Sequence, residues 1–125
     1  MSVVFPQSAA RAAPASLAAV RPFALGEVYV YPNPARSPQR PTFHVEAGFA
    51  DRIEIRVYDL TGELVHEAVL TGDPLLIDDG QGPERAYESA WDASGLGPGT
   101  YPFVVTALRE GQAPLQASGK ASILK

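Results

Sequence analysis

Apolar and polar residues alternate over short stretches of this chain, and glycine, proline and asparagine separate the stretches. In residues 52–60, apolar side chains take every second position and would share one face of a β-strand, namely Ile53, Ile55 and Val57. Thr61 and Gly62 follow, and a second apolar-rich run covers residues 64–70. Because glycine tolerates the positive φ that a tight turn requires, this order predicts a β-hairpin whose connection is residues 59–63.

The same pattern predicts further strands at residues 28–31, 42–47, 87–91, 101–108 and 116–124, and a short edge strand at 75–77 within a long irregular connection of residues 71–85. Residues 101–108 are apolar on both faces, which is typical of a central strand. Pro102 has no N–H to donate to a neighbouring strand, so we expect it at an edge or a bulge.

About seven strands at this spacing fit two packed sheets. We therefore predict an all-β fold, an antiparallel two-sheet sandwich of the immunoglobulin or fibronectin-III type. We expect its core to draw on most of the strands and to include Phe43, Val45, Ile53, Ile55, Val57, Trp91, Tyr101 and Val105.

Composition agrees with a single domain that has many turns. The chain has 125 residues, of which 12 are proline and 11 are glycine, and both residue types are unfavourable inside helices. Residues 1–26 are rich in alanine and proline and lack alternation, so we predict a linker or N-terminal arm there and the sandwich domain at residues 27–125. In an alternative, Val3, Val4 and Phe5 pair as a strand.

Charge and residue content argue against several functional classes. The formal net charge is −4 and the basic residues are scattered, so the chain has no basic surface to bind nucleic acid. No apolar run reaches the roughly 20 residues of a membrane span. The chain has no cysteine, which excludes thiol catalysis and disulfide bonds.

Few residues are candidates for chemistry. The two histidines, His44 and His66, have no partner at catalytic or metal-binding spacing, so we expect both at solvent-facing or sheet-edge positions and predict no catalytic residue and no enzymatic activity. Oxygen ligands are concentrated in one segment, at Asp73, Asp78, Asp79 and Glu84. Their spacing differs from that of a twelve-residue calcium loop and favours a solvated acidic turn without a cofactor; a calcium site is the alternative.

Five short motifs occur in order along residues 28–125: Tyr31-Pro32-Asn33-Pro34, Val57-Tyr58-Asp59-Leu60-Thr61-Gly62 followed by Leu64-Val65, Trp91-Asp92, Gly99-Thr100-Tyr101 and Ile123-Leu124-Lys125. In this order the chain resembles the C-terminal immunoglobulin-like modules shared by type IX secretion sorting domains and the flagellar hook-capping protein. The resemblance implies that these motif residues are structural. It also implies a non-catalytic C-terminal module of an extracellular or cell-surface bacterial protein, which serves secretion, sorting or surface attachment.

The partner implied by this resemblance is a protein of the secretion or anchoring machinery. We expect the last strand to be the segment that the partner recognises, with Lys120 and Lys125 as two positive charges that bracket it. A plainer interpretation is that both lysines keep the strand edge soluble. Two other functions stay open: a self-assembling subunit whose N-terminal arm adds a strand to a neighbour, and an ancillary carbohydrate-binding module that uses Trp91, Tyr87, Tyr101 and Phe103. Core packing is the favoured interpretation for Trp91.

Overall fold

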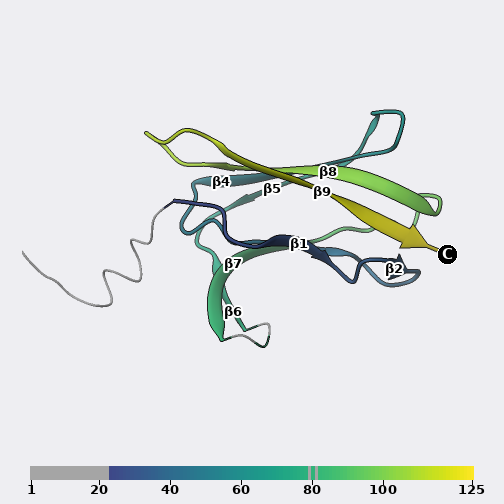
Figure 1. Ribbon diagram of the computed structural model, residues 1–125, viewed down its shortest axis with the longest axis horizontal. Coiled ribbons are helices and arrows are strands. Elements are labelled where there is room, and N and C mark those ends of the chain that lie inside the picture. The colour runs from purple at the N-terminus through teal and green to yellow at the C-terminus, as the bar shows by residue number, and fades with distance from the viewer. Residues whose placement is uncertain (1–22, 79, 81) are drawn as a thin grey trace, which may run out of the picture.

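The computed structural model describes residues 23–78, 80 and 82–125. These residues form two sheets that pack face to face, one above the other in Figure 1. The first sheet has the order β1 (Val28–Tyr31), β3 (Thr42–Val45), β7 (Pro83–Ala90) and β6 (Leu75–Asp78). The second has the order β2 (Ala35–Arg36), β9 (Leu115–Leu124), β8 (Gly99–Leu108), β4 (Arg52–Tyr58) and β5 (Leu64–Thr71). All neighbouring strands are antiparallel except β2 and β9, which confirms the predicted all-β sandwich.

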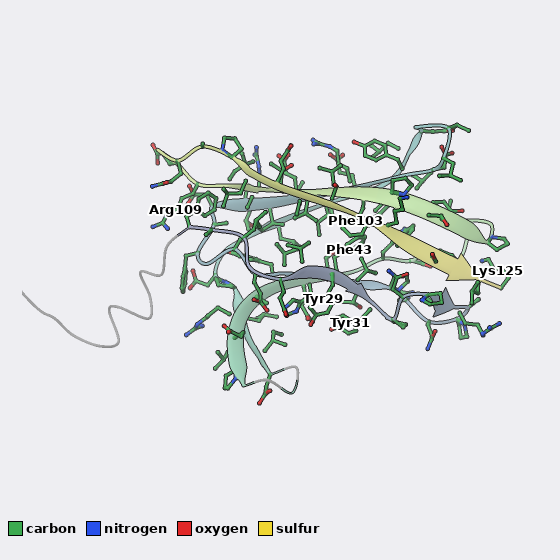
Figure 2. The ribbon with its side chains drawn as sticks, viewed as in Figure 1. Tyr29, Tyr31, Phe43, Phe103, Arg109 and Lys125 are labelled. Carbon is green, nitrogen blue, oxygen red and sulfur yellow. The ribbon has the colours of Figure 1, made fainter. Side chains whose placement is uncertain are left out.

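The core lies between the two sheets and is built from alternate residues of the strands. In β4 every second side chain is buried, as the alternation predicts. All eight predicted core residues are buried, with exposed fractions of at most 8%, which confirms that prediction. The rings of Phe43 and Phe103 meet edge to face across the two sheets, with centroids 5.1 Å apart (Figure 2).

The predicted hairpin is confirmed. Strands β4 and β5 pair antiparallel, and Gly62 in their connection has a φ of 91°. The carboxylate of Asp59 accepts hydrogen bonds from the hydroxyl of Thr61 and from the N–H groups of Thr61 and Glu63. These bonds, the hydroxyl first, lower the pKa of Asp59, and they explain why an aspartate starts this turn.

Residues 71–85 are more regular than we predicted. Strand β6 runs over Leu75–Asp78, and β7 begins at Pro83 and not near Tyr87, so the two strands form a second hairpin. Residues 83–86 have no apolar alternation and therefore gave no strand signal; pairing with β6 makes them a strand. The described residues contain nine strands in place of about seven, because the two-residue β2 between prolines also gave no signal.

Pro102 lies where the central strand β8 has only one neighbour. Residues 103–108 of β8 pair with β4, and the last pair is Val57 with Phe103. Pro102 comes one residue beyond that pair and lies opposite Lys120 of β9. The expectation of an edge at Pro102 is therefore confirmed, although most of β8 is central.

The chain enters the domain along the first sheet. Phe23 and Leu25 pack partly buried against the core, and the N–H of Gly26 donates to the carbonyl of Glu46, which follows β3. Residues 1–22 of the predicted linker or arm, with the proposed strand at Val3–Phe5, lie outside the described residues. The boundary near residue 26 stays a prediction. Within the part of the chain that the structure describes, no helix is long and apolar enough to cross a membrane.

Candidate functional site

The C-terminal strand β9 is an integral part of the sandwich. It pairs with β8 over nine successive residue pairs, from Gly99–Ile123 to Ala107–Leu115. Ala121 and Ile123 point into the core, whereas Lys120 and Leu124 are exposed. Gly119 lies opposite Phe103, and a Cβ atom there would lie only 2.7 Å from Cζ of the Phe103 ring. The glycine therefore makes room for the Phe103 ring in the core.

The outer edge of β9, on the side away from β8, is closed near its end by a side chain. The Nδ2 of Asn33 donates to the carbonyl of Lys120 at 3.0 Å, and the Oδ1 of Asn33 accepts from the N–H of Ser122 at 2.9 Å. This side-chain amide thus bonds the β9 backbone as a residue of a parallel strand would. The two flanking residues, Pro32 and Pro34, have no N–H of their own to offer.

The two-residue strand β2 continues the same edge. Ala35 pairs in parallel with Ile123, two residues beyond the position that Asn33 faces, and Arg36 pairs with Leu124. Beyond them the N–H of Ser37 donates to the carbonyl of Leu124 at 3.2 Å. The backbone of residues 120–123 is therefore held on both sides, and that of Leu124 on the β2 side.

The first half of β9 has no such described partner on its outer edge. Among the described residues, none pairs with the outer edge of β9 over residues 115–119. Backbone directions alternate along a strand, so Gln116 and Ser118 direct their N–H and C=O groups to the same outer side as Lys120 and Ser122. Their side chains are exposed as well.

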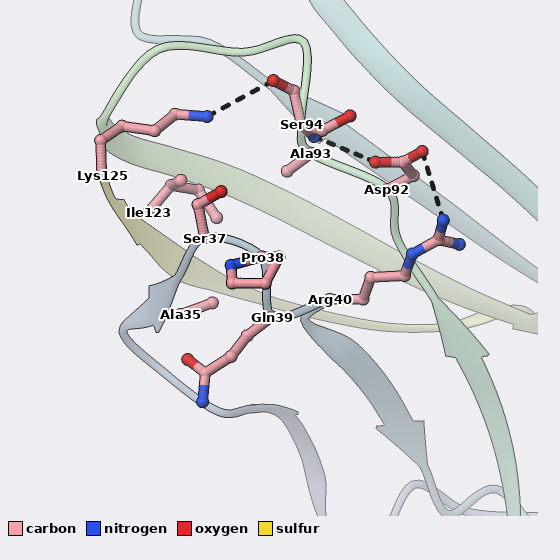
Figure 3. A pocket seen from close by; sticks show the side chains of 10 residues that line it. All are labelled: Ala35, Ser37, Pro38, Gln39, Arg40, Asp92, Ala93, Ser94, Ile123 and Lys125. Atoms are coloured by element: carbon pink, nitrogen blue, oxygen red, sulfur yellow. Dashed lines mark hydrogen bonds and ion pairs between the residues drawn. The ribbon is translucent and has the colours of Figure 1, made fainter.

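A small cavity of about 180 Å³ lies at the end of β9 (Figure 3). Its wall comes from the segment after β2, from the loop after β7 and from the C-terminal residues: Ala35, Ser37, Pro38, Gln39, Arg40, Asp92, Ala93, Ser94, Ile123 and Lys125. Asp92 accepts a hydrogen bond from the N–H of Ser94 and lies 3.6 Å from the guanidinium of Arg40. The hydrogen bonds from Ser94, and then the charge of Arg40, lower the pKa of Asp92.

The two predicted recognition lysines lie apart. Lys120 is exposed on the outer face of the second sheet, opposite Pro102. Lys125 lies at the cavity, where its Nζ donates to the carbonyl of Ser94 at 3.4 Å (Figure 3). Because the two residues are five positions apart, strand alternation directs them to opposite faces. A partner that binds both lysines must therefore contact the end of the sandwich from two sides.

The acidic residues proposed as a calcium alternative do not form one site. Asp73 lies in the connection between β5 and β6, Asp78 ends β6, and Glu84 lies on β7. The carboxylate of Asp78 accepts hydrogen bonds from the N–H groups of Gly80 and Gly82, so it stabilises the hairpin turn. Asp79 lies outside the described residues. Within those residues, no group of three or more His, Cys, Asp or Glu side chains could hold a metal ion.

The prediction for the histidines was wrong for His44 and incomplete for His66. His44 is only 1% exposed, because the ring of Tyr29 stacks on it with centroids 4.4 Å apart. His66 does lie on the edge strand β5, but its ring faces inward and stacks on Trp91 at 5.8 Å. Sequence reasoning missed both because the covering aromatic residues, Tyr29 on β1 and Trp91 after β7, are distant in sequence.

The remaining motif residues lie in turns and in the core. Trp91 is 1% exposed and contacts Phe43 and Tyr101, which confirms that it packs in the core. The hydroxyl of Tyr101 donates to the carbonyl of Gly97, and Gly99 between them has a positive φ of 153°. Tyr58 ends β4 at a register shift. Since Trp91, Tyr101, Phe103 and Tyr87 are all buried, they form no exposed platform for a sugar.

A family model described as the secretion system C-terminal sorting domain matches residues 29–111, well over half of the chain. The chain belongs to this family. The resemblance to type IX sorting domains is thereby confirmed, and the domain is a non-catalytic sorting module. Proteins sorted in this way are secreted or displayed at the bacterial cell surface.

Solved structures agree with the fold. The dimeric latent PorU of Porphyromonas gingivalis matches with a TM-score of 0.57 and 20% identity, over 78% of this chain and 9% of PorU. CopC of Methylosinus trichosporium OB3b matches with a TM-score of 0.44 and 14% identity, over 78% of this chain and 93% of CopC. At 20% identity the PorU match supports the fold alone. The TM-score of the CopC match is too low to support a conclusion about this chain. No curated protein matches the chain.

Proposed function

We propose that this sorting domain, residues 27–125, acts at the C-terminal end of a larger secreted protein and that residues 1–26 link the two. The secretion machinery binds strand β9, and through this contact it delivers the parent protein to the cell surface or the medium. Any enzymatic activity of the parent resides outside the sorting domain.

One observation carries this proposal. The outer edge of β9 is closed at residues 120–124 by Asn33, β2 and Ser37, whereas no described residue pairs with its backbone at Gln116 and Ser118. A partner segment can therefore add main-chain hydrogen bonds to Gln116 and Ser118 without opening the core. Lys120, exposed where the open part ends, offers a charge that selects an acidic partner and discourages indiscriminate pairing.

The test is a set of fusions of the full chain to a secreted reporter in a host with a type IX system. One fusion lacks the last six residues, and a second carries Ser118→Pro, which removes an outward N–H while leaving the β8–β9 pairing in place. A third carries Lys120→Gln and Lys125→Gln together. We expect surface delivery to fall in all three.

Folding of each purified fusion is checked by urea denaturation. A matched control is Ser94→Ala, since the contact of Ser94 with Lys125 uses a backbone carbonyl that the substitution keeps. Full delivery of the folded Ser118→Pro and double-lysine fusions would remove the sorting role from β9. The point variants keep the test decisive even where the truncated fusion does not fold.

A further inference from the structure

His44 lies between two carboxylates. Its Nδ1 is 2.7 Å from Oε2 of Glu88 on β7, and its Nε2 is 2.9 Å from Oε2 of Glu46, just after β3. The histidine side chain is 1% exposed, and those of Glu46 and Glu88 are 17% and 16% exposed. All three lie on the outer face of the first sheet, and the ring of Tyr29 covers His44.

This geometry favours the protonated ring. A neutral imidazole has one N–H and one lone pair, so one of its nitrogens would face a carboxylate with no proton between them. Only the imidazolium donates to both carboxylates. Burial by itself disfavours that charge, but the hydrogen bonds and charges of Glu46 and Glu88 outweigh it and raise the pKa of His44 above its ordinary 6.5.

Three contacts from the first strand and the residue before it converge on this cluster. The Tyr29 ring stacks on His44, the Tyr31 hydroxyl donates to Oε1 of Glu88 at 2.7 Å, and the N–H of Glu27 donates to Oε1 of Glu46 at 3.3 Å. Strand β1 is an edge strand that pairs only with β3 among the described strands. It is also the strand through which the preceding chain enters the sandwich.

We infer that the imidazolium of His44, clamped between Glu46 and Glu88, is a proton-dependent latch that fastens strand β1 to the sheet. When the ring loses its proton, two poorly solvated carboxylates lose the charge between them, and β1 separates from β3 while the rest of the sandwich stays folded. The edge of β3 then becomes available for pairing. This inference does not depend on how β9 is recognised.

The titratable groups that face His44 are Glu46 on its own segment, Glu88 on β7, and Tyr29 and Tyr31 on β1. The bond to Glu88 is the first cause that raises the pKa of Tyr31, to about 12, so Tyr31 keeps its proton over the range that matters. Since the pKa of His44 is raised in the folded state, its contribution is complete below pH 6.5 and is lost as pH rises through the raised value.

The test measures hydrogen-exchange protection factors of the β1 amides that face β3, those of Tyr29 and Tyr31, by NMR between pH 6 and pH 10. We expect β1 protection to fall about tenfold for each pH unit between 6.5 and the raised pKa of His44 and then to level off. The amides of β4 and β8, which exchange only when the whole domain unfolds, should stay more protected than those of β1 at every pH. Nitrogen chemical shifts of the His44 ring should show two protonated nitrogens at pH 7.

Glu88→Gln is the matched variant. A glutamine amide can donate to Nδ1 of a neutral His44 and still accept from Tyr31, so every hydrogen bond survives without the charge. We expect this variant to fold and its β1 protection to vary little with pH. A neutral His44 ring at pH 7, pH-independent β1 protection in the natural chain, or β1 protection as high as that of β4 at every pH would each overturn the latch.

Discussion

Asn33 accepts a hydrogen bond from the backbone N–H of Ser122, which lies 89 residues further along the chain. The same side chain donates to the carbonyl of Lys120. The first sequence motif and the C-terminal strand are therefore parts of one structural unit, and the end of the sorting strand depends on a turn that precedes β2.

We predict that Asn33→Ala lowers the free energy of unfolding by roughly 1–2 kcal/mol, because two hydrogen bonds at a partly solvated edge are lost. Urea denaturation measures this loss, and hydrogen exchange should show faster exchange of the Ser122 amide. The control is Asn33→Asp, which keeps the acceptor for Ser122 and loses only the bond to Lys120. Equal Ser122 exchange in the natural chain and in Asn33→Ala would contradict the role given to this side chain.

Gly119→Ala should destabilise the domain by roughly 1–3 kcal/mol through overpacking, because the new methyl group would press on the Phe103 ring. Chemical denaturation gives the value. Combining the substitution with Phe103→Leu relieves the clash, so the two changes together should cost less than their sum. Additive losses would show that the ring and Gly119 do not constrain each other.

Ile55→Ala should cost roughly 2–5 kcal/mol, because Ile55 is fully buried in β4 and its truncation leaves a cavity. Val69→Ala on the neighbouring strand β5 is the comparison, since Val69 is 53% exposed; its loss should stay within about 0.5 kcal/mol. A loss below about 1 kcal/mol for Ile55→Ala would place that residue outside the core.

Local patterns were sufficient to predict most of the fold. The period of two in residues 52–58 identifies the buried face of β4 because one side of an antiparallel sheet faces the core. The β4–β5 turn is equally local, since Asp59, Thr61 and Gly62 supply its hydrogen bonds and its positive φ. Strand β7 was predicted too short because Pro83, Glu84 and Arg85 pair only with the edge strand β6.

The functional details depend on residues that are distant in sequence. Nothing near His44 indicates that Tyr29 covers it or that Glu88, 44 residues away, accepts a hydrogen bond from its ring. The sequence around Asn33 likewise predicts only a turn, and its bond to β9 is evident only in the folded structure. The one local signal for the His44 cluster was the spacing of His44 and Glu46, which puts both on the same face of a strand.

The two histidines should give opposite pH dependences, and His66 accounts for the acid side. Its ring stacks on Trp91, its Nε2 is buried without a partner among the described residues, and burial lowers its pKa below 6.5. The folded state therefore prefers the neutral ring, while the unfolded chain takes up a proton below pH 6.5. The contribution of His66 is thus complete above pH 6.5 and is lost as pH falls through the lowered value.

We predict that the free energy of unfolding of the natural chain falls more steeply between pH 6.5 and pH 5 than that of His66→Phe. Fluorescence of Trp91, the single tryptophan, follows unfolding at each pH. Glu88→Gln is the control, because it alters only the His44 cluster. It should leave the fall in the free energy of unfolding below pH 6.5 unchanged and reduce the fall above pH 6.5. Parallel acid limbs in the natural chain and His66→Phe would show that proton uptake by His66 is not linked to unfolding, and that its ring is better solvated than its stacking on Trp91 indicates.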